Sequence, residues 1–442
     1  MASAPALRYP GSVIPVPSLY RQDSDFLYLT GVTQPDCVAV LRKEASGEVH
    51  YTLLTPPPDL TDRTWHGARI DADAARRVFG AHEGGHTSAL PALLQDAVHL
   101  ASGGGGGVLL CDLPAQHAPS TPLHDMLRSA VAKLGSASAQ RQSAWNAAAA
   151  GGAVSSLKTL LAPLRWRKSP AELTLMRASA TATAHALSEA AACAVPGARE
   201  GVPAAAFEWH VRGRAGAQRL AFPSVCASGA RACAIHYGRH DGRIEPNDQL
   251  LMDAGCEFHG YVSDVTRTWP VSGAFTDAQR RVYDAVRAVH AAALAAVRPG
   301  VTIAQLHAQS VQATSEHIAD LGMLPDAGSA STIAKGHYFR LYPHALSHYL
   351  GLDTHDTPSV SLTRPLEPGV VLTIEPGLYC WPDTPGLAPR YSGIGVRMED
   401  MVAVTEDGYE VLSSHKLAPV DADEVTRWAQ EARDRASASM RS

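Results

Sequence analysis

Several features that would indicate a particular class of protein are missing from this sequence. Its 7 cysteines include no CxxC pair, and an odd, scattered set in a chain of 442 residues is typical of reduced thiols rather than of a disulfide framework. No apolar run approaches the ~20 residues that a membrane-spanning helix needs. The net charge of −5 provides no basic surface for nucleic acid or an anionic membrane. We therefore expect neither kind of partner.

The first residues also lack clear targeting features. Met1–Pro17 has no charged start followed by an apolar block, as a secretory signal would have, and too few arginines for a typical mitochondrial presequence. We expect an intracellular protein that is not secreted. The cytoplasm is the first expectation, and the matrix of a mitochondrion or another organelle is the alternative, because a cleaved presequence leaves no trace.

Length and composition predict more than one domain. Domains of about 100–200 residues are usual, and 45% of the residues are hydrophobic, which is enough to form buried cores. Strand-like runs at Val38–Leu41, Tyr51–Leu54 and Val108–Cys111, with a helical run at Asp73–Phe79, predict a small α/β domain. The polar stretch Gly135–Gln142 indicates surface or linker. We predict a first domain over 1–150, a linker or helix over 151–165, a second domain over 166–425 and a tail over 426–442.

Two helices of the second domain have clear ends. Ser169-Pro170-Ala171-Glu172 combines a capping box with proline at the first helical position, which predicts a helix that ends before Pro196-Gly197. A second helix over Ala278–Val297 ends before Pro299-Gly300 in the same way. Two helices that each end before a Pro-Gly pair, about a hundred residues apart, suggest a duplication.

A sharper repeat supports this interpretation. Glu245–Gly255 aligns without gaps to Glu367–Gly377, with Glu, Pro, Leu, an acid and Gly in register. Each copy predicts a turn, an apolar strand, a carboxylate at the strand end and a tight glycine turn. We therefore expect two related halves that face each other across a pseudo-two-fold axis, with Asp253 and Glu375 close to it.

Each of these acids has a downstream partner. Asp264 lies on Tyr261–Thr268, a predicted return strand, and Glu399 lies on Ile394–Val404, which is also strand-like. A buried acid needs a partner. Any single acid is more simply a solvated turn residue, but four acids in matched pairs on a duplicated frame favour a common site.

A histidine-rich segment adds another type of ligand. His344, His348 and His355 lie within twelve residues, and the first two share a face in either a helix or a strand. A lone histidine among the 20 in this chain would usually be a satisfied core or surface residue. Four carboxylates and one imidazole, without a thiolate, suit Mn²⁺, Co²⁺ or a labile Zn²⁺ rather than a structural zinc. Two divalent ions ~3.5–4 Å apart would balance the charge and hold a bridging water.

Five segments in order resemble the aminopeptidase P branch of the creatinase/methionine-aminopeptidase family. They are Leu250–Glu257, Gly260–Thr268, His344–His355, Glu375–Tyr379 and Gly393–Asp400. The resemblance spans about residues 165–420. It implies an α/β, or α+β, chain in which a small creatinase-like domain precedes a pita-bread catalytic domain with internal pseudo-two-fold symmetry.

The resemblance also implies roles for individual residues. It assigns the metal ions to Asp253, Asp264, His348, Glu375 and Glu399, with Glu399 bridging the two ions. Glu375 doubles as proton acceptor and donor for the bridging water. The substrate is assigned to His236, His344, His355 and Tyr379, with His344 and His355 bonding the carbonyl and the tetrahedral intermediate. Arg397, two residues before Glu399 on a strand and so on the same face, resembles an arginine that orients the carboxylates.

The N-terminal part matches the same branch. Tyr20–Gly31 and Trp65-His66-Gly67 resemble the creatinase-like domain, which methionine aminopeptidases lack. Relatives usually carry an arginine- and leucine-rich helical segment before this point. This sequence does not show that segment, so we leave the compartment open. The resemblance implies a homo-oligomer, a dimer or tetramer, in which Trp65 of one chain reaches a neighbour's cleft. The alternative is that Trp65 packs within its own domain.

The expected function is that of a metal-dependent aminopeptidase. It would release the N-terminal residue from peptides with proline in second position, by attack of a hydroxide that bridges two ions, preferably Mn²⁺, with Co²⁺ or Zn²⁺ as alternatives. A prolidase with the same metal ligands and an intermediate-cleaving aminopeptidase without a need for proline stay open. A metal-free binding module is disfavoured because all five ligands are present, and creatinase because it lacks this carboxylate set.

Overall fold

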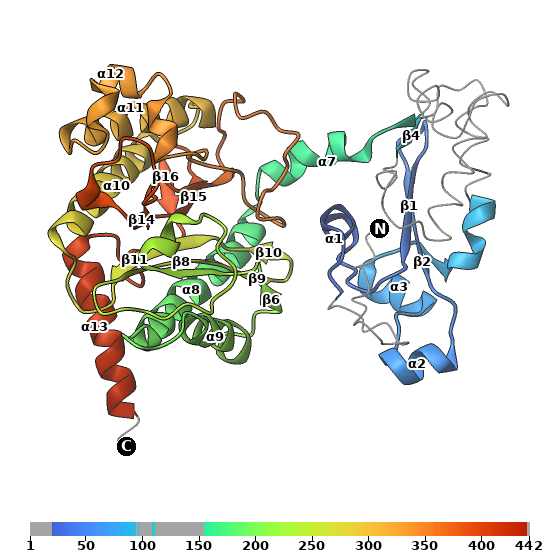
Figure 1. Cartoon of the computed structure of the whole chain (residues 1–442). Coiled ribbons are helices and arrows are strands. Elements are labelled where there is room, and N and C mark those ends of the chain that lie inside the picture. Colours follow the sequence, from blue (N-terminus) through green and yellow to red (C-terminus); the bar gives the residue numbers. More distant parts are fainter. Residues whose placement is uncertain (1–19, 94–95, 97–107, 111–153, 440–442) are drawn as a thin grey trace. The chain divides into compact units, whose positions relative to one another are not determined.

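The computed structural model describes residues 20–93, 96, 108–110 and 154–439, and Figure 1 labels its elements. The chain divides into two compact units, residues 1–161 and 162–442. The predicted polar stretch Gly135–Gln142 lies outside the described residues.

A small mixed sheet forms the centre of the first unit. Strand β1 (Val38–Lys43) pairs antiparallel with β2 (Val49–Thr55), and β2 pairs parallel with β3 (Glu83–His86). Helix α3 (Ala72–Phe79) packs on β2 and β3, and its Ala75 contributes to a core with Val32 and Leu53. The remaining elements are α1 (Ser24–Thr30), α2 (Leu60–His66), the 3₁₀ turn Thr87–Ala89, β4 (Leu109–Leu110) and β5 (Val154–Ser155).

These elements test the local predictions for this unit. The predicted strands Val38–Leu41 and Tyr51–Leu54 and the helix Asp73–Phe79 are confirmed. The strand expected at Val108–Cys111 covers only Leu109–Leu110, and Cys111 lies outside the described residues. Trp65 lies on helix α2.

The second unit contains long helices that begin as predicted. In α8 (Pro170–Cys193), Ser169 N–H donates to Glu172 Oε2 at 2.7 Å and Glu172 N–H donates to Ser169 Oγ at 3.4 Å, which closes the capping box. Helix α10 (Asp277–Ala296) begins with a similar box at Thr276. Helix α7 (Leu157–Trp166) begins in the first unit and ends in the second. The other helices of the second unit are α9 (Gly201–Trp209), the π-helix His210–Arg214, α11 (Ile303–Asp320), α12 (Ala330–Ile333), α13 (Ala422–Ser439), and 3₁₀ turns at Gly229–Cys233, Pro325–Ala327, His337–Arg340 and Pro389–Tyr391.

The strands of this unit repeat one topology twice. In the first half β8 pairs antiparallel with β11, and β9 with β10; in the second half β12 pairs antiparallel with β15, and β13 with β14. The strands are β6 (Arg219–Leu220), β7 (Val225–Ser228), β8 (Gln249–Ala254), β9 (Cys256–Phe258), β10 (Tyr261–Val262), β11 (Val265–Pro270), β12 (Val371–Ile374), β13 (Gly377–Cys380), β14 (Ile394–Arg397), β15 (Asp400–Val404) and β16 (Tyr409–Val411). The duplicated frame inferred from the repeat agrees with this pairing.

The structure corrects the predicted strands in one respect. The runs Tyr261–Thr268 and Ile394–Val404 are not continuous, because each is interrupted at its acid, Asp264 or Glu399. The predicted glycine turn after Asp253 does not reverse the chain either, because Gly255 leads directly from β8 into β9. A Cβ at Gly255 would clash with the carbonyl oxygen of Ser263, so glycine permits a close backbone approach here.

Helices cover both faces of these strands. Figure 1 shows α10, α11 and α12 on one side and α8 and α9 on the other. Leu294 and Leu306, from α10 and α11, pack against Leu372 and Val402 of β12 and β15, while α13 packs along α8. Within the described residues, no helix combines the length and the apolar character needed to cross a membrane. The interrupted strands therefore lie between helices that pack on both sides of them.

Candidate metal centre

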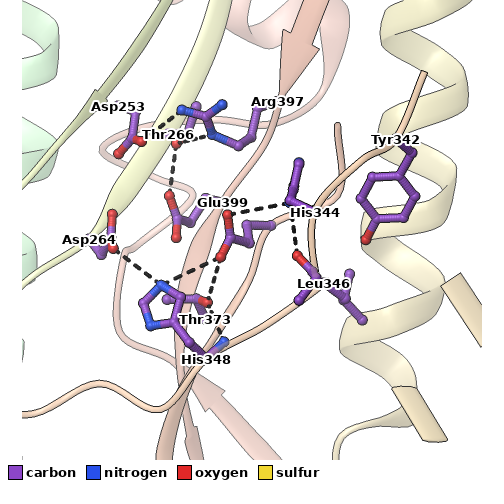
Figure 2. A network of polar contacts seen from close by, with 12 residues as sticks. Asp253, Asp264, Thr266, Tyr342, His344, Leu346, His348, Thr373, Arg397 and Glu399 are labelled. Carbon is purple, nitrogen blue, oxygen red and sulfur yellow. Dashed lines mark hydrogen bonds and ion pairs between the residues drawn. The ribbon is translucent and has the colours of Figure 1, made fainter. Parts of the chain in front are cut away.

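Each predicted carboxylate lies where a strand of the duplicated frame ends or is interrupted. Asp253 lies near the end of β8, Asp264 before β11, Glu375 after β12 and Glu399 before β15. Figure 2 shows Asp264 and Glu399 facing the ring of His348. One ligand atom from each of these three residues lies within 4.8 Å of the other two. His348 Nε2 also lies 3.4 Å from Glu375 Oε1.

Hydrogen bonds fix the orientation of His348. Its Nδ1 lies 3.1 Å from the carbonyl oxygen of Tyr349, which can only accept, so Nδ1 carries the proton. The other ring nitrogen, Nε2, points toward the carboxylates and would offer its lone pair to a metal. This is the usual way in which a backbone carbonyl prepares a histidine to bind a metal.

Burial and mutual repulsion dominate the electrostatics of the acids. Burial, followed by the neighbouring Asp253 carboxylate, raises the pKa of Asp264 well above its ordinary value. Burial and Asp264 do the same to the pKa of Glu399. For Glu375, burial and Glu399 raise the pKa to about 8. The site thus concentrates carboxyl groups whose negative charge is unfavourable without a counter-charge, so that in the absence of metal they favour the protonated state.

Arg397 compensates part of this charge. Its Nη2 donates to Asp253 Oδ2 at 2.7 Å, its Nη1 to Tyr379 Oη at 2.8 Å and its Nε to Thr266 Oγ1 at 3.2 Å. Among the described residues, the buried Oδ1 of Asp253 has no hydrogen-bond partner. Such an oxygen requires a donor or a cation. An oxygen-rich set with one imidazole fits hard or borderline divalent ions, so these residues fit the metal that the sequence implied.

His344 lies beside the acids but is already hydrogen-bonded. Its Nδ1 lies 2.8 Å from the carbonyl oxygen of Ala345 and its Nε2 lies 2.9 Å from Tyr379 Oη. Burial, followed by the charge of Arg397, lowers the pKa of His344 to about 3, so the ring is neutral. With Nδ1 protonated, Tyr379 donates to Nε2.

The other two histidines lie at the exposed border of the site. The ring of His355 lies 4.5 Å from that of His348, and both His236 and His355 are exposed. Burial, His348 and His236 all lower the pKa of His355. Trp65 is 76% exposed on α2 of the other unit. The second unit thus brings together every predicted site residue except Trp65.

Comparison with known proteins identifies the family of this chain. Residues 174–406 match metallopeptidase family M24, and residues 11–103 match the N-terminal domain of aminopeptidase P. The chain belongs to metallopeptidase family M24.

Relatives of this metallopeptidase carry two kinds of name. It is 38% identical to the mitochondrial intermediate cleaving peptidase 55 of Arabidopsis thaliana, over 90% of this chain and 73% of that protein. It is 33% identical to the Xaa-Pro aminopeptidase of Escherichia coli, over 89% of this chain and 86% of that protein. A variant of Escherichia coli aminopeptidase P in complex with substrate has a TM-score of 0.84 at 30% identity, covering 98% of this chain and 93% of that one.

Sequence reasoning missed two threonines of this M24 site. Thr266 Oγ1 donates to Glu399 Oε2 at 2.8 Å, and Thr373 Oγ1 donates to Glu375 Oε1 at 3.3 Å. Each lies two residues from a predicted ligand, Asp264 or Glu375, and strand alternation places such residues on the same face. That spacing was the available signal.

Proposed function

We propose that this M24 metallopeptidase is an aminopeptidase that releases the first residue of peptides whose second residue is proline. The observation that carries the proposal is the convergence of four strand-end carboxylates and His348, bordered by three further histidines, in a chain similar to an Xaa-Pro aminopeptidase over most of its length. A second candidate is a proline-independent aminopeptidase. The 38% identity to an intermediate cleaving peptidase favours it.

We propose that two divalent ions, preferably Mn²⁺, are held by five residues. The residues that would hold the ions are Asp253, Asp264, His348, Glu375 and Glu399. When bound, the ions lower the pKa of a water and stabilise negative charge on the substrate carbonyl. Arg397 and Thr266 hold the carboxylates of Asp253 and Glu399 in place.

The protein's own groups bind the peptide and move the proton. Glu375 accepts a proton from the attacking water and passes it to the leaving nitrogen. Without metal, burial and Glu399 raise the pKa of Glu375 to about 8, so its surroundings favour uptake of a proton. Bound ions would oppose this shift. His355 and His236, at the exposed border, contact the substrate. His344 contacts the carbonyl once a substrate replaces one of its present hydrogen-bond partners.

We also propose that the protein assembles as a homo-oligomer. Residues 1–150 form the assembly domain, 151–165 the linker or helix, 166–425 the catalytic domain and 426–442 the tail. The exposure of Trp65 supports an interface role, since a largely exposed tryptophan is a frequent anchor in protein contacts.

For location, we propose the cytoplasm, with a mitochondrial matrix as the alternative. The Arabidopsis thaliana relative is named mitochondrial. Fractionation of the source cells, with markers for each compartment, tests this proposal.

Peptide hydrolysis tests the function. Purified protein is freed of metal, reconstituted with Mn²⁺, Co²⁺ or Zn²⁺, and offered an Xaa-Pro-Xaa tripeptide, an Xaa-Pro dipeptide and a peptide with a bulky first residue and no proline. We expect cleavage of the tripeptide and little of the dipeptide. Preference for the dipeptide identifies a prolidase, and preference for the third peptide identifies the second candidate. The Asp264→Asn variant is the control for contaminating peptidases.

A further inference from the structure

A buried ionic cluster lies directly behind His355. Asp356, which follows it in the chain, is 3% exposed, and Lys168 is 6% exposed. Lys168 Nζ donates to Asp356 Oδ2 at 3.1 Å and to the carbonyl oxygen of Trp166 at 3.3 Å. Arg165 Nη2 donates to the other oxygen of Asp356 and, at 2.8 Å, to Asp353 Oδ2. Two cations thus hold the side chain next to an exposed site histidine.

The backbone of the same loop connects His355 to the metal centre. The carbonyl oxygen of Tyr349 accepts from His348 Nδ1 at 3.1 Å and from Asp356 N at 2.9 Å. This doubles the loop back on itself, so that the rings of His348 and His355 lie 4.5 Å apart at 73°. The position of His355 therefore depends on where Asp356 is held.

The loop adopts a conformation that its own residues do not favour. Thr357 has φ 46° and is 3% exposed, and among the described residues its hydroxyl has no hydrogen-bond partner. A β-branched residue with positive φ is an outlier, which persists only where surrounding contacts determine it. A Cβ at Gly351 would clash with Asp356 and lie 2.9 Å from Lys168 Cε. The chain therefore packs tightly around this ion pair.

The cations come from a segment that is itself fixed to the second half of the frame. Arg165 lies near the end of α7 and Lys168 just before α8. Lys168 N–H donates to the carbonyl oxygen of Gly369 at 2.7 Å, and Arg167 forms a bridge with Val370, just before β12. Lys168 thus reaches Asp356 from a segment whose backbone is hydrogen-bonded to the residues just before β12.

Burying the charge of a lysine to hold a loop costs free energy. Burial lowers the pKa of Lys168, and Asp356 opposes that shift. Buried ion pairs often stabilise a fold no better than apolar residues of similar size, and orientation of neighbouring groups is one reason to retain them. The proposed mechanism assigns no other role to Lys168.

We propose that Lys168 is a positioning residue that acts through Asp356 to hold His355 at the substrate. The inference rests on the proposed function, because it takes His355 to contact the peptide. Lys168 itself touches neither the substrate nor the carboxylates of the metal centre.

A double-mutant cycle tests the proposal. In the wild-type background, Lys168→Met should lower kcat roughly 10- to 100-fold, as misplacement of a reacting group by about 1 Å can do, while metal content stays unchanged. In a His355→Ala background the same substitution should have little further effect on kcat, because the group through which it acts is gone. Lys168→Arg should recover part of the loss. The matched control is Arg177→Met, which removes an ion pair to Glu410 from the same helix region and should leave kcat unchanged.

The alternatives give different results. An equal loss of kcat in both backgrounds, or a loss of bound metal, would overturn the proposal. If Lys168→Met does not fold, Lys168→Met/Asp356→Asn, which removes both charges, takes its place in the cycle. If wild-type protein cleaves no peptide, the proposed function fails, and nuclear magnetic resonance of the His355 ring decides the inference: a shifted ring signal in Lys168→Met but not in Arg177→Met supports it, and an unchanged signal rejects it.

Discussion

Arg397 and Asp253 form a largely buried ion pair of 2.7 Å in which the guanidinium bonds one carboxylate oxygen and leaves the other without a donor among the described residues. The same guanidinium bonds Tyr379 and Thr266. It therefore fixes the orientation of the Asp253 carboxylate and keeps Oδ1 available for a cation. An arginine provides several donors in a rigid plane, which a lysine does not.

Arg397→Lys should consequently weaken the metal centre although the charge is retained. Loss of such an orienting partner typically costs about 10- to 100-fold in metal affinity or activity. Titration with Mn²⁺ and the kcat/KM of the reconstituted protein measure the effect. Arg177→Lys is the control, since its ion pair with Glu410 is half-exposed. Equal metal affinity and kcat/KM in wild type and Arg397→Lys would contradict the role assigned to Arg397.

Glu399→Ala should abolish activity and should affect stability differently with and without metal. In chelated protein, the substitution removes one of several buried acids whose pKa values are raised by burial and by the neighbouring carboxylates, so its loss is partly compensated. With metal bound it removes a ligand, and metal binding stabilises the folded state directly. The decrease in Tm should therefore be larger with Mn²⁺ than with chelator. Equal decreases would exclude Glu399 as a ligand between the ions.

The pH dependence of stability should change sign on metal removal. Burial and Glu399 raise the pKa of Glu375 from 4.5 to about 8, so between these values the folded chain binds a proton that the unfolded chain has released. Stability of metal-free protein should then fall as the pH rises through this window. Ions bind the deprotonated carboxylates, so Mn²⁺ should reverse the trend. Thermal unfolding at pH 5 and pH 8, with chelator or Mn²⁺, measures this, and Glu375→Gln should flatten the metal-free trend. A metal-free Tm that rises with pH would reject the argument.

The sequence could predict which residues meet in the candidate site because they occupy recognisable places in the chain. Asp253 and Glu375 stand at the same position in two copies of one repeat, and α8 begins at a recognisable cap. The interruptions at Asp264 and Glu399 could not be predicted, because they arise where the chain leaves one strand pair and joins another across the frame, as in the bridge between Thr266 and Glu399.

Contacts between distant segments were equally inaccessible to sequence reasoning. Lys168 and Asp356 are 188 residues apart, and each alone would be expected at the surface. Only the packed structure reveals that they meet in the interior. The hydrogen bond from Tyr379 to His344 is a similar case, because it depends on how one loop approaches β13.

His344→Ala should reduce kcat far more than it weakens metal binding. Both ring nitrogens are engaged by Ala345 and Tyr379, so the structure assigns neither to a metal. Loss of one electrostatic contact to the reacting carbonyl typically costs ~10²–10³ in kcat. Steady-state kinetics and metal analysis of the same preparation separate the two effects. A variant that has lost its metal would identify His344 as a ligand instead.

Trp65→Ala should affect substrate binding without disturbing the metal centre. Trp65 is 76% exposed and Leu60 on the same helix is 82% exposed, so α2 presents two large apolar side chains that its own unit does not cover. Aromatic residues in such positions commonly anchor protein interfaces. If Trp65 of one chain borders the cleft of another, the variant should keep its metal and its assembly but show a raised KM for longer peptides. Light scattering gives the size of the particle, and kinetics with peptides of increasing length give the KM. Leu60→Ala is the matched control for loss of apolar surface on α2. A monomeric wild-type protein whose Trp65→Ala variant is fully active would reject the proposal, since neither an interface nor a shared cleft would then be needed.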